Sequence, residues 1–450
     1  MSTTTTTAPR LSPAKERYFA ANRSIWLFPL IFSITASWVQ APALVTSAEA
    51  AFRWGWQGLL WFAIPNMLAL VIFAPFAHRI RSRLPHGFTL SGYMRHAYGP
   101  KVQRVYLFQM TALSICVFAV QMIAGGTIIA YITGWDYWLI AALMAGGTLL
   151  YSTLGGLTAS VIADFFHIGA TILTIALFAP ILVKTVGLDT VAAGMSSAHV
   201  DPWTVALTFG IPTAIGLLAG PFGDQSFWQR SFATNARHLR KAFTIAGFLF
   251  VLVPLSTGML GFVAAGTGME IENTQLANIA VINEYFPAWA IIPFTIMVIG
   301  ALASTMDNCL VSGSTMMGHD LTDKGDPIRR GRIGGFAVAI IGLSIALIPG
   351  LTLIHLWLIY ATMRAATLAP TILTFIRKDW QPAANGMFWG IIIALAVAMP
   401  LFIYGSFVPG ADLWKTVGSL LTIIISTTFC VLVRKSPQEV AARDRVEAEN

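Results

Sequence analysis

The sequence predicts an all-α integral membrane protein with about twelve transmembrane helices. Three observations lead to this fold class: the composition, the length of the apolar segments and the placement of the basic residues. Of the 450 residues, 56% are hydrophobic and only 11% are charged, a balance typical of membrane proteins. A hydrocarbon core about 30 Å thick is crossed by roughly 20 helical residues, and apolar segments of that length recur along the chain.

The expected spans follow one another with short polar connections. They lie near residues 24–45, 56–77, 105–133, 136–154, 159–183, 203–222, 242–266, 287–316, 334–350, 352–376, 386–407 and 415–433.

Most Lys and Arg residues fall in alternate connections between these spans, Arg230 and Arg237 after the sixth span among them. Cytoplasmic loops of membrane proteins hold the excess of basic residues, so we expect both termini in the cytoplasm and an even number of spans. The net charge of +8 then reflects topology, and a nucleic-acid partner is not expected. The expected location is the cell (inner) membrane, which the chain crosses several times.

The ends of the chain are polar. Residues 1–23 are expected to form a disordered cytoplasmic leader, and residues 434–450 a cytoplasmic tail. A cleaved signal peptide is the alternative for the first span, but the leader is too long and the span contains Trp38, Gln40 and Pro42. The 3 Cys residues lie in apolar segments and indicate no disulfide framework.

Two spans contain residues that interrupt helices. The first carries Gln40, Ala41 and Pro42 near its middle, and the sixth carries GPFG at residues 220–223. Either interruption alone would be a structural kink, but breaks at corresponding positions of two halves indicate inverted repeats around a midplane site. We therefore expect repeats at residues 24–183 and 203–376, with two additional spans at 386–433.

The eighth span is apolar except for a polar group near its middle. Ala301, Ser304 and Thr305 share one helix face by their i, i+3, i+4 spacing. The two hydroxyls could bond to their own helix or to a neighbour, yet the adjacent Asp307, an ionisable group inside a span, favours a functional site. No metalloprotease or phosphate-loop motif is present, so an enzyme is not expected.

Four stretches, in this order, resemble the sodium/solute symporter family. They are TLSGYMRHAYGP (89–100), YSTLGGLTASVIADFFH (151–167), FGDQSFWQRSFA (222–233) and ALASTMDNCLVSGSTMMGHDL (301–321). The resemblance covers roughly residues 25 to 380 and implies the leucine-transporter-like fold, with broken helices one and six and transport by alternating access.

The resemblance also implies a sodium site. Its ligands would be the carbonyls of Ala36, Val39 and Ala301 and the hydroxyls of Ser304 and Thr305. Asp164 would lie close to this site and draw or relay the cation, although position alone also fits a carboxylate that caps the start of the fifth span. Some family members have an Asp where this chain has Trp38, which argues against a second cation site there.

The substrate would lie between the two breaks. The candidate contacts are Trp38, Gln40, Pro221 and Phe222, with Gln121 of the third span as a further polar contact. Arg364 is a charged residue within the tenth span, with three alternative uses. It could hold a substrate carboxylate, pair with an acidic residue of a gate, or extend toward the cytoplasm.

These observations lead us to expect sodium-coupled symport of a small polar organic solute, urea-like or amino-acid-like. The expected partners are this solute, Na⁺ and the lipid bilayer, without an obligatory protein partner. A proton-coupled symporter of the same fold and a channel-like facilitator are the alternatives, and a channel would need a continuous polar pore.

Overall fold

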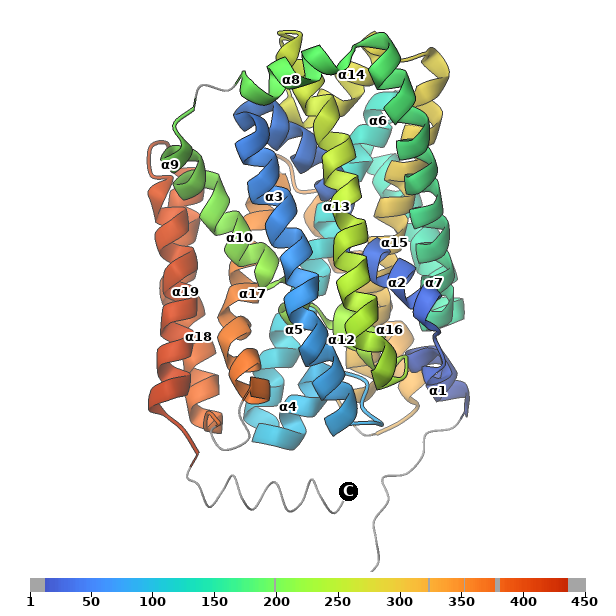
Figure 1. Ribbon diagram of the computed structural model, residues 1–450. Helices are drawn as coiled ribbons and strands as arrows, with labels where there is room; N and C mark the ends of the chain where they lie inside the picture. The colour runs from blue at the N-terminus through green and yellow to red at the C-terminus, as the bar shows by residue number, and fades with distance from the viewer. Residues whose placement is uncertain (1–12, 198–199, 323, 352, 377–380, 436–450) are drawn as a thin grey trace, which may run out of the picture.

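The computed structural model describes residues 13–197, 200–322, 324–351, 353–376 and 381–435. Within these residues the secondary structure is helical apart from one isolated bridge between Pro382 and Arg434, and most helices run along one common axis (Figure 1). The expected all-α membrane fold is confirmed.

The helices of the first half are α1 (Pro13–Ala20), α2 (Leu27–Trp38), α3 (Ala41–Arg83), α4 (Leu90–Tyr98), α5 (Pro100–Gln121), α6 (Thr127–Thr133), α7 (Tyr137–Thr185) and α8 (Leu188–Ser196). Those of the second half are α9 (Pro202–Val205), α10 (Ile211–Leu218), α11 (Gly220–Gly223), α12 (Gln225–Phe232), α13 (Ala236–Gly266), α14 (Ala277–Tyr285), α15 (Ile291–His319), α16 (Pro327–Ala346) and α17 (Leu353–Ile376). Two further helices follow, α18 (Ala384–Phe407) and α19 (Leu413–Leu432).

Two of these helices are too long to cross a membrane once. The helix α3 has 43 residues and α7 has 49, whereas about 20 residues suffice for one crossing. Each contains a glycine at positive φ, Gly55 at 58° and Gly156 at 55°, where the chain leaves the helical conformation at little steric cost. Each element is therefore two helical segments joined at that glycine.

The described part of the chain has 8 helices that are long and apolar enough to span a membrane, or up to 9 with the bent pair that includes α2. With α3 and α7 divided at their glycines, the order of helices is consistent with the twelve or so expected spans. The start of α1 and the end of α19 lie at the same end of the molecule, as an even number of crossings requires (Figure 1).

Both expected breaks are present. The first separates α2 from α3 at Val39 and Gln40, whose ψ angles are 84° and 156°. The second surrounds α11: a turn at Ala219 precedes it, and Asp224, with φ −106° and ψ 117°, is extended after it. Pro42 and Pro221 each lie in the first turn of the following helix, where the missing N–H removes no helical hydrogen bond.

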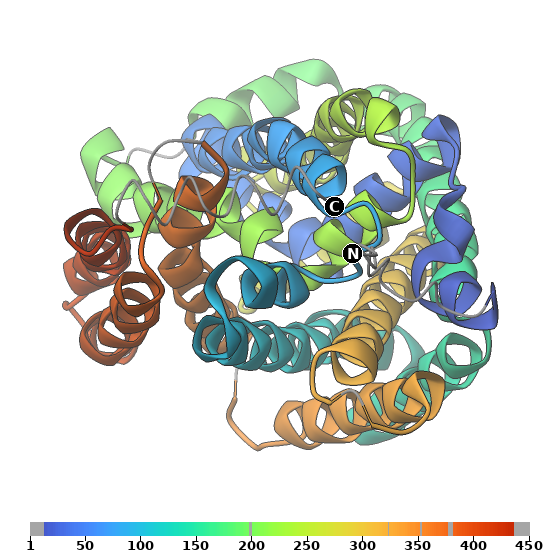
Figure 2. The ribbon, with the colours of Figure 1, turned by 90° about the horizontal axis from the view of Figure 1, so that it is seen from below.

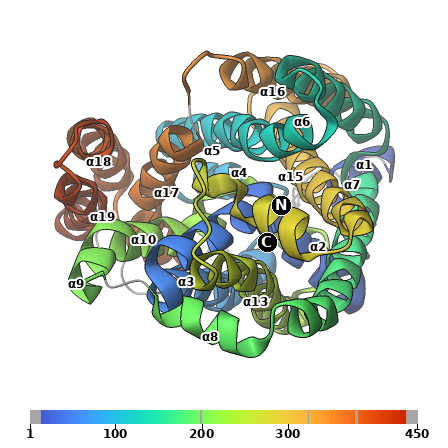
Figure 3. The same ribbon diagram turned by 90° about the horizontal axis from the view of Figure 1, so that it is seen from above.

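The broken helices lie inside the bundle. α2 packs against α7, α13 and α15, which lie around it in Figure 3, while α18 and α19 pack on each other and against α17 at one side (Figures 2 and 3). The helices α18 and α19 therefore lie at the edge of the bundle.

The structure corrects one boundary. The sixth span continues beyond its extended residue as α12, and Arg230 on this helix is only 1% exposed. The expectation that Arg230 belongs to a cytoplasmic connection is wrong, because its charge is satisfied by buried polar groups instead of water.

Candidate ion and solute site

A buried carboxylate links the first half of span one to three other helices. Asp164 of α7 is fully buried and accepts hydrogen bonds from Ser33 Oγ of α2 at 2.5 Å and from Ser304 Oγ of α15 at 2.5 Å. Arg230 of α12 completes it with an ion pair, Nη2 to Oδ2 at 2.8 Å. We call these four residues the Asp164 cluster. A buried charge needs such partners, so the cluster ties α2, α7, α12 and α15 together.

All three nitrogens of the Arg230 guanidinium donate hydrogen bonds. Besides Asp164, its Nε donates to Ser33 Oγ at 2.8 Å, Nη1 donates to the Ser226 carbonyl at 3.1 Å, and Nη2 donates to Asn308 Oδ1 at 2.6 Å. The Asn308 amide in turn donates to Ser37 Oγ at 3.2 Å. Every nitrogen of this guanidinium thus has an acceptor.

The expected sodium ligands lie beside this cluster. Ala36 and Ala301 are fully buried, and in the described part of the chain no backbone N–H donates to the carbonyls of Ala36 or Val39, because the helix ends there. The Ser37–Asn308 bond holds this end of α2 against α15, one turn from Ser304.

The two expected hydroxyl ligands differ in their bonding. Ser304 donates its proton to Asp164, which leaves its oxygen lone pairs available as ligands. Thr305 is 2% exposed, and its Oγ1 has no hydrogen-bond partner among the described residues. A buried hydroxyl without a partner is uncommon, and the oxygen of Thr305 is free to accept one.

Asp307 lies outside the Asp164 cluster. It is fully buried, and neither carboxylate oxygen has a hydrogen bond within the described residues. The hydroxyls of Ser152 and Ser160 lie close to it, and the Ser160 hydroxyl donates to Asn308 Oδ1 at 2.9 Å. Within the described residues, Asp307 is thus a buried acid beside two serine hydroxyls.

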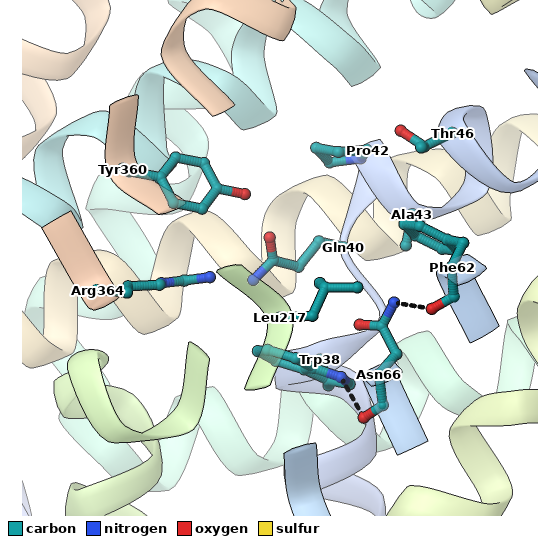
Figure 4. Close-up of a pocket in the computed structure, with 10 residues that line it drawn as sticks. All are labelled: Trp38, Gln40, Pro42, Ala43, Thr46, Phe62, Asn66, Leu217, Tyr360 and Arg364. Atoms are coloured by element: carbon teal, nitrogen blue, oxygen red, sulfur yellow. Dashed lines mark hydrogen bonds between the residues drawn. The ribbon is translucent and has the colours of Figure 1, made fainter. Parts of the chain in front are cut away.

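A small cavity of about 30 Å³, enough for one or two waters, lies between the first break and α17 (Figure 4). It is lined by Trp38, Gln40, Pro42, Ala43, Thr46, Phe62, Asn66, Leu217, Tyr360 and Arg364. The Trp38 indole is fixed by its Nε1, which donates to the Asn66 carbonyl at 3.1 Å. The wall is therefore mainly apolar with a few polar groups, a character typical of solute sites.

The expected substrate residues occupy three kinds of position. Trp38 and Gln40 line the cavity. Gln121 lies behind Gln40: its Nε2 donates to Gln40 Oε1 at 3.3 Å, and its Oε1 accepts from the Ala41 N–H at 3.0 Å, which holds the break in place.

Pro221 and Phe222 are buried on α11 and do not line this cavity. The Phe222 ring packs at 5.2 Å from Phe73 and 5.0 Å from Phe76, ring centre to ring centre. The neighbouring Gly220 meets the first break, since a Cβ there would lie 2.2 Å from the Trp38 ring. The two breaks are thus in direct contact.

Arg364 of α17 pairs with Asp224, the extended residue of the second break, at 3.3 Å. Its guanidinium carbon lies 4.6 Å from the centre of the Tyr360 ring, and its buried Nε has no acceptor in the described residues. Of the three expected uses of Arg364, pairing with an acidic residue is the one observed.

Ser33, Asn66, Arg230 and Tyr360 are among the residues of the site that were not anticipated. Ser33 precedes Ser37 by one turn, and this pair of hydroxyls on one face of span one was a usable signal. Tyr360 likewise precedes Arg364 by one turn. Nothing in the sequence pairs Arg230 with an acid 66 residues away.

Known proteins with similar sequences are transporters. The chain is 24% identical to the probable urea active transporter 1 of Schizosaccharomyces pombe over 61% of its length and 42% of the relative's. It is 20% identical to a urea-proton symporter of Oryza sativa subsp. japonica over 58% of its length and 41% of the relative's. The chain thus spans less than half the length of these curated relatives.

The fold also has solved counterparts. The structure reported as the substrate-bound, outward-open state of a Na⁺-coupled sialic acid symporter matches with a TM-score of 0.74 at 12% identity, over 94% of this chain and 93% of that one. The family description "Sodium:solute symporter family" matches residues 18–394. Because this match covers most of the chain, the protein belongs to the sodium:solute symporter family.

Proposed function

We propose that the protein is a secondary active transporter that couples Na⁺ entry to uptake of a small polar organic solute, urea-like or amino-acid-like, by alternating access. The observation that carries this proposal is the buried, unpartnered hydroxyl of Thr305. Leaving such a group unsatisfied costs about 1–3 kcal/mol, which a cation ligated by its oxygen would offset. The carbonyls of Ala36, Val39 and Ala301 and the hydroxyl of Ser304 would supply the remaining oxygens.

Asp164 has an orienting part in this proposal. Since it accepts the Ser304 proton, the Ser304 lone pairs are left for the ion. Arg230 balances the Asp164 charge, so neutral oxygens provide most of the attraction for Na⁺. Such a site binds the ion and can release it when α2 and α15 separate.

The solute would bind at the cavity between the first break and α17, which would have to widen to admit it. Trp38 and Gln40 would contact it directly, and Gln121 would act by holding Gln40. Pro221 and Phe222 would reach it when α11 moves, since α11 meets the first break at Gly220. We place the termini in the cytoplasm and the repeats at residues 24–183 and 203–376, related by inversion in the membrane plane, with spans 386–433 outside them. The cell (inner) membrane is the proposed location.

Proton coupling is the alternative for the driving ion, because one relative is named a urea-proton symporter. Na⁺ coupling and proton coupling can be distinguished by measuring which ion gradient drives solute accumulation. A tenfold Na⁺ gradient contributes about 1.4 kcal/mol, enough to hold a tenfold gradient of solute. In proteoliposomes, solute accumulation should therefore follow the Na⁺ gradient and stop when choline replaces Na⁺, whereas a proton-coupled carrier would follow the pH gradient.

The site itself is tested by Ser304→Ala combined with Thr305→Ala. The double variant removes two expected ligands and keeps the helix, since Ala is the best helix former. We expect the Na⁺ concentration for half-maximal uptake to rise at least tenfold, with weaker apparent solute affinity, because the two ligands are linked through one conformational equilibrium.

The matched control is Thr295→Ala with Ser344→Ala, two hydroxyls that bond only to carbonyls of their own helices. This pair should leave the Na⁺ dependence of uptake unchanged. If the Ser304/Thr305 hydroxyls only join helices, their loss would lower stability by about 1 kcal/mol and leave the Na⁺ curve where it was, and the proposed site would be abandoned.

A further inference from the structure

Arg364 differs from an ordinary structural arginine in how little of its hydrogen-bonding capacity is used. A guanidinium has five N–H donors. In the described residues Arg364 makes one hydrogen bond, from Nη2 to Asp224, and its Nε is buried without an acceptor. The side chain is 3% exposed, so its contact with bulk water is small, and the adjoining cavity has room for only one or two water molecules. Such a group is costly to bury, which indicates that a further partner completes it.

The existing partner holds Arg364 loosely. The distance to Asp224 is 3.3 Å, longer than the 2.8 Å between Arg230 and Asp164 and longer than about 2.7–2.9 Å for strong charge-assisted bonds. Asp224 is the extended residue of the second break, and a Cβ at the preceding Gly223 would lie only 2.8 Å from Arg364 Cγ. Arg364 therefore packs directly against a segment whose conformation is expected to change during transport.

The free part of the guanidinium faces the cavity. Figure 4 shows Arg364 extending from α17 toward Gln40 of the first break, with Tyr360 on the same helix above it. The Tyr360 ring covers the guanidinium face at 4.6 Å, which leaves the donor edge for a ligand. Among the described residues that line the cavity, Arg364 is the one with a charge.

We infer that Arg364 binds a carboxylate group of the transported solute, and that the substrate is a small organic carboxylate. A carboxylate matches the planar donor edge of a guanidinium with two parallel hydrogen bonds, whereas an amide offers one oxygen and turns N–H donors toward it. Phe62, Leu217 and Trp38 would enclose a short apolar body at the other side of the cavity. The carboxylate would also balance the charge of the cotransported cation.

This inference rests on the proposed function and narrows it. Between urea-like and amino-acid-like solutes it selects those with a carboxylate, with or without an ammonium group. During binding the carboxylate would replace Asp224 on part of the guanidinium, which releases the second break to move. The pair would thus couple solute recognition to the conformation of α11.

The test measures Na⁺-driven uptake into proteoliposomes for four solutes of similar size: propionate, alanine, propionamide and urea. We expect uptake of propionate, alanine or both, and at least tenfold weaker uptake of the two neutral solutes. Propionate without alanine would assign monocarboxylates, and alanine without propionate would assign zwitterions. Na⁺-driven uptake confined to urea and propionamide would overturn the inference and leave the proposed function standing, whereas no Na⁺-driven uptake of any solute would overturn both.

Two variants then examine Arg364 itself. Arg364→Lys keeps the charge and loses the planar donor edge, so we expect the KM for the carboxylate to rise at least tenfold. Arg364→Gln with Asp224→Asn removes both charges of the pair, which preserves folding better than loss of one charge, and should abolish carboxylate uptake. Carboxylate uptake at the original KM in the folded double variant would show a purely structural pair and overturn the inference.

The matched control is Arg53→Gln with Glu49→Gln. It removes an ion pair with 3.4 Å between nitrogen and oxygen, in which Arg53 is 48% exposed and neither residue lines the cavity. This control should leave the KM unchanged, which separates the effect of Arg364 from a general effect of charge removal.

Discussion

Two buried arginines in this protein have the same kind of partner and different surroundings. Arg230 and Arg364 are 1% and 3% exposed, and each forms an ion pair with an aspartate. Arg230 donates to Asp164, Ser33, Asn308 and the Ser226 carbonyl, whereas in the described part of the chain Arg364 donates to Asp224 alone.

The difference separates a scaffold from a binding group. A guanidinium whose nitrogens are all satisfied fixes the helices around it, and Arg230 does this for α2, α7, α12 and α15. A guanidinium with unused donors beside a cavity is poised for a ligand. Burial and residue type are alike at the two positions, so the count of satisfied donors is the informative observation.

Among the variants that compare the two arginines, we expect the largest loss of stability for Arg230→Met. It leaves the Asp164 carboxylate buried with only the two serine hydroxyls, and loss of one partner of a buried pair costs about 3–5 kcal/mol. Thermal unfolding in detergent should show a strongly lowered Tm or no folded protein. Arg230→Met with Asp164→Asn should recover much of this loss. If Arg230→Met alone lowered the Tm only slightly, Arg230 would not have the structural role assigned to it.

A smaller loss is expected for Arg364→Gln, about 1–2 kcal/mol. It breaks one long hydrogen bond, and the Asp224 side chain that remains is 13% exposed and retains some contact with water. The same unfolding measurement compares the two arginines directly. If Arg364→Gln lowers the Tm as much as Arg230→Met, the two arginines are equivalent and the contrast fails.

The smallest effect, about 1 kcal/mol, is expected for Gly223→Ala, where the new methyl group would push against Arg364 Cγ at 2.8 Å. This change displaces Arg364 without altering its chemistry, so solute KM should rise while the Tm changes little. Gly146→Ala is the control, because a Cβ at Gly146 meets nothing within 4 Å and Ala favours the helix. A rise in KM for both variants would argue against a special position of Arg364.

Most of the fold followed from local properties of the sequence. The length of each apolar segment corresponds to the membrane thickness, and the alternation of basic connections predicts the even number of crossings. The two breaks were predictable because Pro42 lacks an N–H and because the GPFG stretch disfavours a continuous helix. The shared face of Ala301, Ser304 and Thr305 follows from helical periodicity alone.

The partners of the buried charges were decided by the tertiary structure. Arg230 meets an acid 66 residues away, and Arg364 meets one 140 residues away. The cost of burying a charge requires that each be paired, which the sequence predicts in general, but the choice of partner depends on which helices pack together. For the same reason, only the assembled bundle distinguished the saturated Arg230 from Arg364 with its unused donors.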